Sequence, residues 1–427
     1  MTDLADSLLP RLLNFRPFGE LDLGPQGVAP HYPGLSLLNL PASLCQWLQA
    51  LPLPHPPLAI PELEEFGPGA KQIVLALVDG LSFDRFVKLL DGPGRFLRPW
   101  VDRGLLAPVT SVVPATTSTA LTTLWTGRSP AEHGILGYEI LLQEYGLVAN
   151  MVTLSPASFE QAGHLEKAGF SPEQALPVPT LGTHLATDGI EVHAFLPAGL
   201  RQNGLSRMHY SDVAAHGFGS VSDLWLAVRD LIRQPPPLRR LVWVYYGELD
   251  TLSHRYGPDS DQVQAEACGF LRSLNDHFVA QVSGETTRDV LVILTSDHGQ
   301  IATPPNPHYD LERHPSFTRR LHLLPTGENR LAYLHSRPGQ TQAVIECVER
   351  TWPGAFRLMS SGHALRAGLF GPGKPDGDAL SRLGDAILSA QGQAYLWWAR
   401  KPNTLLGRHG GLSRDEVLVP LLAFRLG

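Results

Sequence analysis

Four short runs of apolar and mostly β-branched residues stand out along the chain, each long enough for one buried strand. They cover residues 72–78, 190–196, 240–246 and 289–295. Between them lie stretches with the apolar period of a helix, of which 223–233 and 262–282 are the clearest. Continuous apolar strands that alternate with amphipathic helices predict an α/β fold, with a mostly parallel central sheet covered by helices on both faces.

The two ends of the chain and one internal region depart from this pattern. Residues 1–70 are rich in Pro and Leu and predict an irregular N-terminal extension packed on the core. Residues 301–405 contain clustered prolines and glycines and only short strand candidates, which predicts an inserted α+β cap. Residues 406–427 return to a core-like composition, so we expect one core built from residues 71–300 and 406–427.

Composition narrows the classes of partner. The 427 residues carry a net charge of −7, which argues against nucleic acid or an anionic membrane as the main partner. The three cysteines stand far apart, so neither a disulfide framework nor a thiolate zinc site is indicated. The N-terminus does not read as a secretion signal, and no apolar run approaches the roughly 18 residues of a membrane span. We therefore expect a cytoplasmic protein, and nothing in the sequence indicates its oligomeric state.

Charged and imidazole side chains follow three of the four predicted strands. Asp79 ends the first strand, Asp250 and His254 follow the third, and Asp297 and His298 follow the fourth. In open parallel sheets the functional crevice lies beyond the carboxyl ends of the strands, so these side chains should converge. Each has an ordinary alternative, such as a helix N-cap or a surface pair. Together, crowded carboxylates of this kind predict a bound metal.

The segment "PATTSTALTTLWTG", residues 114–127, predicts a helix with several hydroxyls at its start. Thr116 or Thr117 would lie at the helix N-terminus, where free N–H groups and the helix dipole favour an anion. A hydroxyl beside a metal in that position can lose its proton and attack phosphorus. The alternative is that both threonines only cap the helix.

Taken in order, these segments resemble the alkaline phosphatase superfamily, and most closely its type I phosphodiesterase/nucleotide pyrophosphatase branch. The resemblance does not cover the first 70 residues or the inserted region. The matching stretches are "VDG" at 78–80, "TSTALTTLWTGRSPAEHGI" at 117–135, "GELDTLSH" at 247–254, "TSDHGQ" at 295–300 and "HGG" at 409–411.

The resemblance assigns roles to individual residues. In the family the nucleophile stands ten residues before the Gly of a Thr-Gly pair, which is Thr117 here, with Thr116 as its rival. It also implies two divalent metal ions, usually zinc, although Mn or Fe can occupy the same donors. One ion would be held by Asp250, His254 and His409, and the other by Asp79, Thr117, Asp297 and His298. His409 has no independent signal in the sequence, because "GRHGG" also reads as a glycine loop.

The implied activity is that of a two-metal phosphoesterase, which hydrolyses phosphodiester or nucleotide pyrophosphate bonds through a phosphothreonine intermediate. Members of this branch usually carry Asn twenty-one residues after the nucleophile, where this chain has Tyr138. Tyr138 would either donate a hydrogen bond to the phosphoryl group or form a wall of the site. Arg128 is the arginine of the matched motifs and a second candidate for substrate binding. Apolar walls for a substituent would come from residues 394–400 or from His308 and Tyr309.

Several other functions fit the same scaffold. A phosphomonoesterase, a phosphonate hydrolase or a phosphotransferase or mutase would use the same residues on another substrate or acceptor. A sulfatase is disfavoured because the nucleophile position holds Thr and not Cys or Ser. A non-enzymatic phosphate-binding protein is disfavoured because no ligand or nucleophile is lost. We expect the partner to be a small, nucleotide-like phosphate ester.

Overall fold

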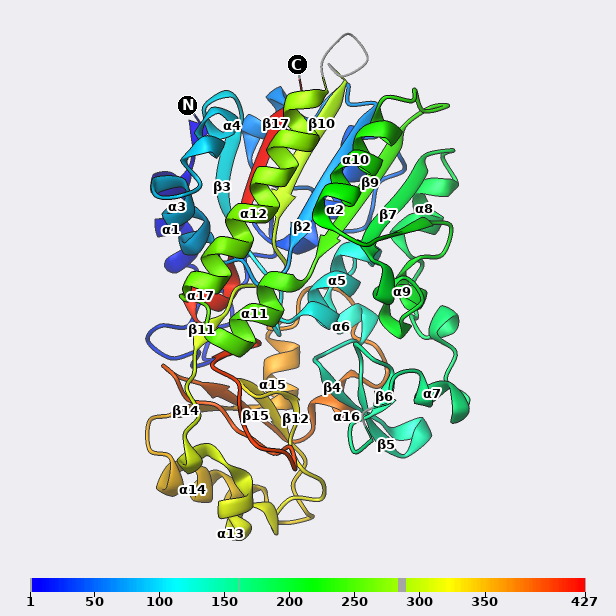
Figure 1. Ribbon diagram of the computed structural model, residues 1–427. Coiled ribbons are helices and arrows are strands. Elements are labelled where there is room, and N and C mark those ends of the chain that lie inside the picture. Colours follow the sequence, from blue (N-terminus) through cyan, green and yellow to red (C-terminus); the bar gives the residue numbers. More distant parts are fainter. Residues whose placement is uncertain (1, 160, 283–288, 427) are drawn as a thin grey trace.

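The large sheet of the computed structural model has eight strands, and the model describes residues 2–159, 161–282 and 289–426 (Figure 1). All four apolar runs form strands of this sheet, which confirms the predicted α/β class. Five strands are parallel neighbours, and β17 runs antiparallel between β10 and β3. In spatial order the strands are β1 (Thr2–Asp3), β3 (Leu105–Thr110), β17 (Leu418–Arg425), β10 (Val290–Thr295), β2 (Gln72–Val78), β9 (Arg240–Tyr246), β7 (Glu191–Pro197) and β8 (Ala214–Phe218).

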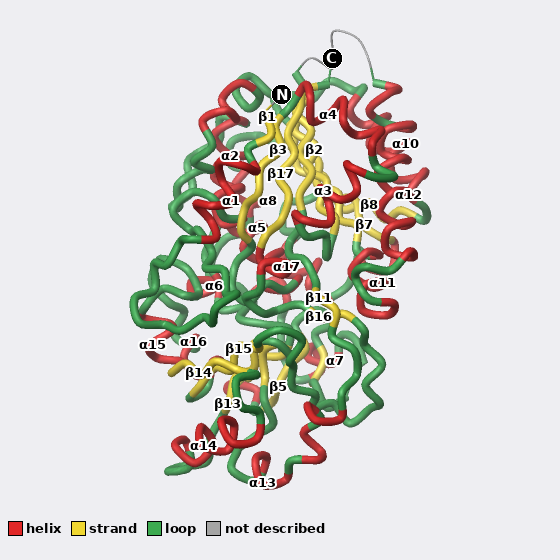
Figure 2. The backbone as a smooth tube through the Cα atoms, turned by 90° about the vertical axis from the view of Figure 1, so that its left-hand side faces the viewer, coloured by secondary structure: helices red, strands yellow, loops and turns green. Residues whose placement is uncertain are grey.

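Helices cover both faces of this sheet, as the edge-on view in Figure 2 shows. On one face Trp243 of β9 packs against Trp125, with ring centroids 4.6 Å apart. On the other face Tyr246 of β9 stacks on Phe270 at 4.3 Å. One layer contains α3 (Phe83–Asp91), α4 (Arg98–Arg103), α10 (Val221–Ile232), α11 (Glu248–Tyr256) and α12 (Asp261–His277). The opposite layer contains α1 (Ala5–Leu13), α2 (Leu40–Trp47), α5 (Thr117–Thr126), α8 (Leu181–Ala186) and α9 (Gly204–His209).

A second lobe lies beyond one end of the sheet and contains a seven-stranded antiparallel sheet. It combines strands from two parts of the chain, so the cap expected at 301–405 is extended by strands from within 139–156. Its strands in order are β14 (Phe356–Ser360), β15 (Ala386–Ala390), β13 (Leu331–Leu334), β12 (Thr326–Glu328), β4 (Glu139–Leu142), β5 (Leu147–Asn150) and β6 (Ser155–Pro156). Its short helices are α7 (His164–Lys167), α13 (Pro315–Thr318), α14 (Thr341–Thr351), α15 (Ser361–Arg366) and α16 (Ala379–Leu383).

The N-terminal extension is more regular than its composition predicts. It forms α1 and α2, and β1 adds a strand beside β3 at the edge of the large sheet. Leu35, Leu38 and Leu44 are fully buried in the main core, so the extension is part of the packed body. Within the described residues, no helix is both long and apolar enough to cross a membrane.

The arrangement places the predicted site at one edge of the large sheet. The neighbouring strands β10, β2 and β9 are parallel, so their carboxyl ends lie side by side. The helix α5 begins at the same edge. A two-stranded ribbon of β11 (Ile301–Ala302) and β16 (Gly407–Arg408) lies close by, followed by the short helix α17 (Arg414–Val417).

Candidate metal centre and nucleophile

The parallel strands deliver five of the predicted side chains to one place. Asp79 follows β2, and Asp297 with its neighbour His298 follows β10, the strand that pairs with β2. Asp250 and His254 lie one turn apart on α11, which begins two residues after β9. The apolar runs form the buried strands, and the polar residues that end them therefore meet at the sheet edge.

His409 reaches the same place through the two-stranded ribbon. Ile301 of β11 lies opposite Arg408 of β16. This pairing brings the segment that holds His409 next to the segment that holds His298, although the two are far apart in sequence. The rings of His409 and His298 stack with centroids 4.0 Å apart and an interplanar angle of 24°. No sequence pattern indicated this pairing, because each ribbon strand has only two residues.

One group of ligand atoms surrounds His298. Its Nε2 lies 3.4 Å from Asp79 Oδ1 and 3.5 Å from Asp297 Oδ2. All three side chains are buried. Both carboxylate oxygens have no hydrogen-bond donor among the described residues. Two buried oxygens without donors, aimed at one point, are the chemistry that a cation satisfies.

A second group of ligand atoms surrounds Asp250. His254 Nε2 lies 3.3 Å from Asp250 Oδ2, and His409 Nε2 lies 3.7 Å from Asp250 Oδ1. The ring centroids of His254 and His409 are 5.1 Å apart. The ligand atoms of Asp250, His298 and His409 also lie within 4.8 Å of one another, so His298 borders both groups. The six side chains thus form two adjoining donor sets, each of a kind that zinc, manganese or iron accepts.

Two of the three imidazoles, those of His254 and His298, are oriented by their second nitrogens. His254 Nδ1 lies 2.9 Å from the carbonyl oxygen of Gly407, and His298 Nδ1 lies 3.2 Å from that of Gly299. An imidazole that donates to a carbonyl from one nitrogen keeps the lone pair of the other available for a metal. Both Nε2 atoms are the ones that face the carboxylates.

The two candidate hydroxyls differ clearly in their surroundings. Thr117 Oγ1 lies 3.3 Å from Asp79 Oδ2 and 3.1 Å from His298 Nε2, inside the first donor set. The side chain of Thr116, in the N-cap position of α5, makes no capping hydrogen bond and is bonded instead to Glu328. Neither hydroxyl caps the helix, which removes the capping alternative, and only that of Thr117 reaches the predicted ligands.

The free N–H groups of α5 point to the same place as the Thr117 hydroxyl. This helix of ten residues has no acidic side chain in its first turn, and its C-terminus is closed by Gly127 in the left-handed conformation. Its N-terminal charge is therefore left for an anion that approaches Thr117.

The pKa values of the three buried carboxyls are shifted in different directions. Burial, followed by the charge of Asp297, raises the pKa of Asp79 well above its usual value. Burial and the charge of Asp250 raise the pKa of Asp297 to about 7. Burial also acts to raise the pKa of Asp250, but His254 and His409 outweigh it and hold that pKa below its usual range. Such a cluster binds a proton or a cation in place of the missing positive charge.

Glu328 is a residue of this neighbourhood that the sequence did not single out. It ends β12 of the second lobe and is 7% exposed. Its carboxylate accepts a hydrogen bond from Thr116 and another of 2.9 Å from the backbone N–H of Tyr138. Burial raises the pKa of Glu328 to about 8. The stretch "TGENR" reads as a surface turn, and only the sheet shared by β12 and β4 brings Glu328 inside.

Tyr138 is anchored by its backbone to Glu328, which also bonds to Thr116 at the start of α5. Its N–H is held by Glu328, and its side chain is 39% exposed. The other proposed walls are mixed, because residues 394–397 are buried in the second lobe whereas the remaining candidates are partly or fully exposed. Tyr395 and Leu396 are fully buried, Trp397 is buried, and Tyr309 packs against Tyr395. His308 is exposed.

Arg128 is not brought to the site. It follows the C-terminus of α5, about 15 Å along the helix from Thr117 at about 1.5 Å per residue. Its Nη1 lies 3.4 Å from Glu132 Oε1, and Glu132 also bonds to His55. Because the whole length of α5 separates Arg128 from Thr117, the structure lends the predicted contact with the substrate no support, and that contact stays a prediction.

We therefore predict that Arg128→Gln leaves kcat and KM within about twofold of the wild-type values. The reason is that the guanidinium contributes a partly exposed ion pair, which is usually worth less than about 1 kcal/mol. Steady-state kinetics on any accepted ester will check this. A drop of tenfold or more in kcat/KM would mean that Arg128 contacts the substrate after all.

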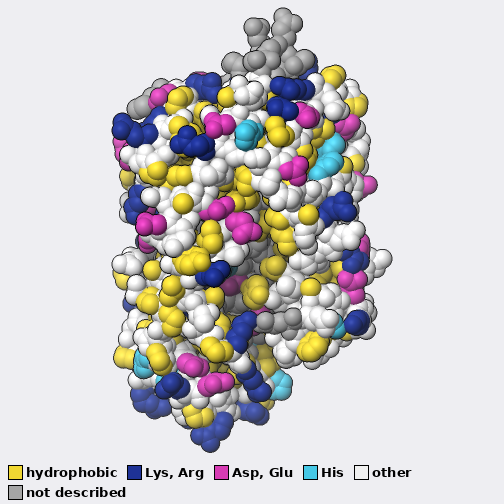
Figure 3. All heavy atoms as spheres, in the orientation of Figure 1, with side chains coloured by type: hydrophobic (Ala, Val, Ile, Leu, Met, Phe, Trp, Pro, Cys, Tyr) yellow, Lys and Arg dark blue, Asp and Glu magenta, His cyan; other side chains and the backbone are white. Residues whose placement is uncertain are grey.

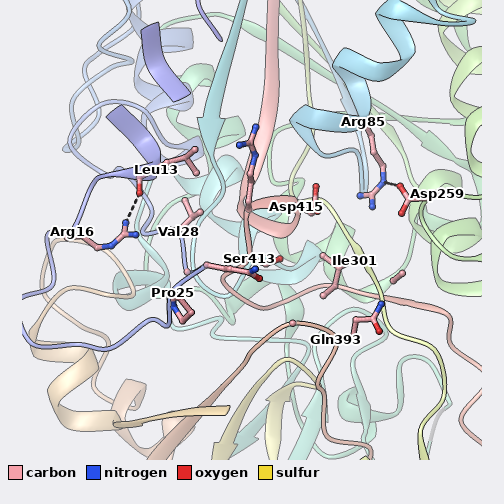
Figure 4. A pocket seen from close by; sticks show the side chains of 15 residues that line it. Leu13, Arg16, Pro25, Val28, Arg85, Asp259, Ile301, Gln393, Ser413 and Asp415 are labelled. Atoms are coloured by element: carbon pink, nitrogen blue, oxygen red, sulfur yellow. Dashed lines mark hydrogen bonds and ion pairs between the residues drawn. The ribbon is translucent and has the colours of Figure 1, made fainter. Parts of the chain in front are cut away.

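A pocket of about 660 Å³ lies elsewhere, where the N-terminal extension meets β11 and the start of α17 (Figure 4). Arg16, Arg85, Asp259 and Asp415 are among the residues that line it, and none of the predicted site residues does. Arg85 already donates to Asp259 and to the carbonyl oxygen of Gln300. The charges of Arg85 and Asp259 thus compensate each other. The surface in Figure 3 is hollowed between the two lobes, with acidic side chains inside the hollow.

Comparisons with known proteins support the assignment of this geometry to a family. No curated protein sequence matches the chain. Mouse ectonucleotide pyrophosphatase/phosphodiesterase 5, in an inactive form with AMP, superposes with a TM-score of 0.62 at 16% identity, covering 83% of this chain and 88% of that one. Phosphonoacetate hydrolase from Sinorhizobium meliloti, with phosphonoformate, gives a TM-score of 0.62 at 16% identity, covering 84% and 91%.

These two similarities show the fold, a mostly parallel sheet flanked by helices. The family model of the type I phosphodiesterases/nucleotide pyrophosphatases matches residues 73–412, which include every predicted ligand and both threonines. The match spans the second lobe as well as most of the core. The chain belongs to the type I phosphodiesterase/nucleotide pyrophosphatase family.

Proposed function

We propose that this phosphoesterase hydrolyses phosphodiester or nucleotide pyrophosphate bonds, with Thr117 as nucleophile and two divalent cations, zinc in the first place. The observation that carries the proposal is the position of the Thr117 hydroxyl, 3.3 Å from Asp79 and 3.1 Å from His298, at the N-terminus of a helix. A hydroxyl in this position is built for attack on an anion and not for capping.

The donor set supports the two cations. Asp79, Asp297 and His298, with Thr117, would hold one cation, and Asp250, His254 and His409 the other. The unpartnered oxygens of Asp79 and Asp297 fit this assignment, because a cation would satisfy both. When bound, such cations lower the pKa of a hydroxyl and offset the charge on the attacking and leaving oxygens.

The chain's own groups perform the remaining tasks. The hydroxyl of Thr117 donates to Asp79 Oδ2, which fixes its rotamer and directs its proton toward a carboxylate. The free N–H groups of α5 favour the phosphoryl oxygens. Thr117 Oγ1 then forms a bond to phosphorus as the bond to the leaving oxygen breaks, with inversion at phosphorus. Water later cleaves the phosphothreonine with a second inversion.

The charges around Thr117 favour a substrate with one negative charge. The hydrogen-bond partners of the Thr117 hydroxyl in the described part of the chain are a carboxylate and an imidazole, with no guanidinium or ammonium among them. Buried Glu328 lies next to Thr116 and adds no positive charge. A phosphomonoester carries nearly two charges and gains most from a bidentate arginine. A diester carries one negative charge and needs less positive charge from the protein. Its second substituent would lie toward the second lobe.

We predict that kcat/KM for a p-nitrophenyl nucleotide ester exceeds that for p-nitrophenyl phosphate by at least about tenfold, the effect of one charged hydrogen bond of about 1.5 kcal/mol. Steady-state assays with both esters on the zinc-loaded protein provide the measurement. A preference for p-nitrophenyl phosphate would assign the chain to the phosphomonoesterases.

A second candidate is cleavage of a carbon–phosphorus bond. It is favoured by the similarity to phosphonoacetate hydrolase, of which 91% is covered. Release of inorganic phosphate from phosphonoacetate, faster than from the nucleotide ester, would replace the first proposal with this one. The same enzyme preparation serves both assays, so the comparison is internal.

A further inference from the structure

Tyr245 touches one of the proposed metal ligands from the neighbouring strand. It is the second-last residue of β9, paired in register with Leu77 of β2, two residues before Asp79. Its hydroxyl donates a hydrogen bond of 2.6 Å to Asp79 Oδ2. Side chains alternate along a strand, so Tyr245 shares the α5 face of the sheet with Trp243, which packs on Trp125 of α5.

The backbone beside Tyr245 is shaped to admit its hydroxyl. A Cβ atom at Gly247 would lie 2.9 Å from the Tyr245 hydroxyl oxygen and 3.3 Å from Cε1 and Cζ of the ring. The φ of Gly247 is −100°, which any residue adopts, so glycine is not needed for conformation. The absence of a side chain at Gly247 leaves the space that the Tyr245 hydroxyl occupies.

We propose that Tyr245 is a positioning residue for the metal centre, holding Asp79 in the orientation that binds a cation. Asp79 has two oxygens with different roles. Oδ2 accepts from Tyr245 and Thr117, whereas Oδ1 has no donor among the described residues and faces His298. The hydroxyl thus fixes which oxygen is left for the cation. The inference rests on the proposed metal dependence.

The adjacent residue offers a matched control. Tyr246 lies on the opposite face of the same strand, stacks on Phe270, and donates its hydroxyl to Glu266 of α12. Removing this hydroxyl also deletes one hydrogen bond, in this case that of a buried tyrosine, but away from the ligands. A purely structural role would make the two Tyr→Phe variants behave alike.

The test is a zinc titration of metal-stripped wild type, Tyr245→Phe and Tyr246→Phe, in competition with a chromophoric chelator. Loss of a group that orients a ligand typically costs 10–100-fold in metal affinity. We expect Tyr245→Phe to weaken at least one of the two zinc ions by about that factor, and Tyr246→Phe to stay within about twofold of wild type. Thermal melts of the stripped proteins establish that both variants fold.

A second variant keeps the test decisive if Tyr245→Phe does not fold. Gly247→Ala displaces the hydroxyl without removing it and should weaken zinc binding severalfold. In the Tyr245→Phe background the same change should cost less, because the closest atom is gone. Equal zinc affinity in wild type and Gly247→Ala, and in Tyr245→Phe where that variant folds, would overturn the inference alone. Failure of the wild type to bind zinc, manganese or iron would overturn the proposed metal centre and the inference with it.

Discussion

Thr117→Ala is expected to lower kcat by at least about three orders of magnitude, because in the proposed reaction the side chain forms a covalent bond and no other described hydroxyl occupies its place. Its hydroxyl lies 3.3 Å from Asp79 and 3.1 Å from His298. Metal content and melting temperature should stay close to the wild-type values, since the remaining ligands come from other segments. Steady-state kinetics and elemental analysis of the same sample are the measurements.

Thr116→Ala is the matched control for this prediction. It removes a hydroxyl one residue away that bonds to Glu328 and not to the donor sets. The cost of that hydrogen bond is about 1 kcal/mol, so kcat should change by no more than about tenfold. If Thr116→Ala were the inactive variant and Thr117→Ala the active one, the nucleophile would be the neighbour. Full activity of both would refute covalent catalysis by either threonine.

The large sheet could be predicted from the sequence because its strands are buried on both faces. A strand such as β2 has every residue buried, and this requires an unbroken apolar run that is visible without a structure. The second lobe gave no such signal. Its strands β4 and β5 have partly exposed positions and only four residues each, so their patterns are weak.

The same difference separates the site residues that could be predicted from those that could not. Asp79, Asp250 and Asp297 end or follow strands of the predicted sheet, so topology alone placed them together. His409 depended on a resemblance, because a ribbon of two-residue strands holds it in place. Glu328 and Tyr245 had no signal, since their roles arise from single contacts between strands that are adjacent only in the fold. The place of Arg128 at the far end of α5 could not be predicted, because a motif fixes order in sequence but not the direction of a side chain.

Removal of metal is the second change from which we expect a large effect. Exhaustive chelation should lower kcat by at least about three orders of magnitude, because the Thr117 hydroxyl then has no group that lowers its pKa. Zinc added back to about two equivalents should restore activity, while zinc added to Thr117→Ala should not. Full activity in the chelated protein would rule out the two-metal assignment of these ligands.

Chelation should also change how stability depends on pH, and the direction follows from the donor sets. In the metal-free protein, burial acts to lower the pKa of His254, but the charge of Asp250 outweighs it and raises this pKa to about 9. An unfolded histidine has a pKa of about 6.5. The native state therefore holds an extra proton between these values, and the stabilisation it gives is fully present below pH 6.5 and is lost as the pH rises through 9.

Asp297 also makes the metal-free protein less stable as the pH rises, but over a lower pH range than His254. Its native pKa of about 7 lies above the value of about 3.9 in the unfolded chain, so its burial costs stability as the pH rises from about 4 to 7. Below pH 6.5 the buried neutral imidazoles of His133 and His209, whose pKa burial lowers to about 3, act in the opposite direction. Between pH 6.5 and 9 these two histidines no longer oppose the effect of the donor set, so the pH dependence of stability reports on the donor set most directly in this range.

We predict that the melting temperature of the chelated protein falls as the pH is raised from 6.5 to 9, and that the zinc-loaded protein loses less or none. Zinc competes with protons for the same carboxylates and imidazoles, so its affinity and its stabilisation grow with pH. The gap between the two melting curves should widen across this range, as scanning calorimetry can measure. His254→Gln is the matched variant, because it removes one of the groups that titrate in this window, and its chelated form should show a flatter profile even though Glu328, with a pKa of about 8, still titrates there. A gap that narrows with rising pH would mean that these residues do not bind the cation as anions and neutral imidazoles.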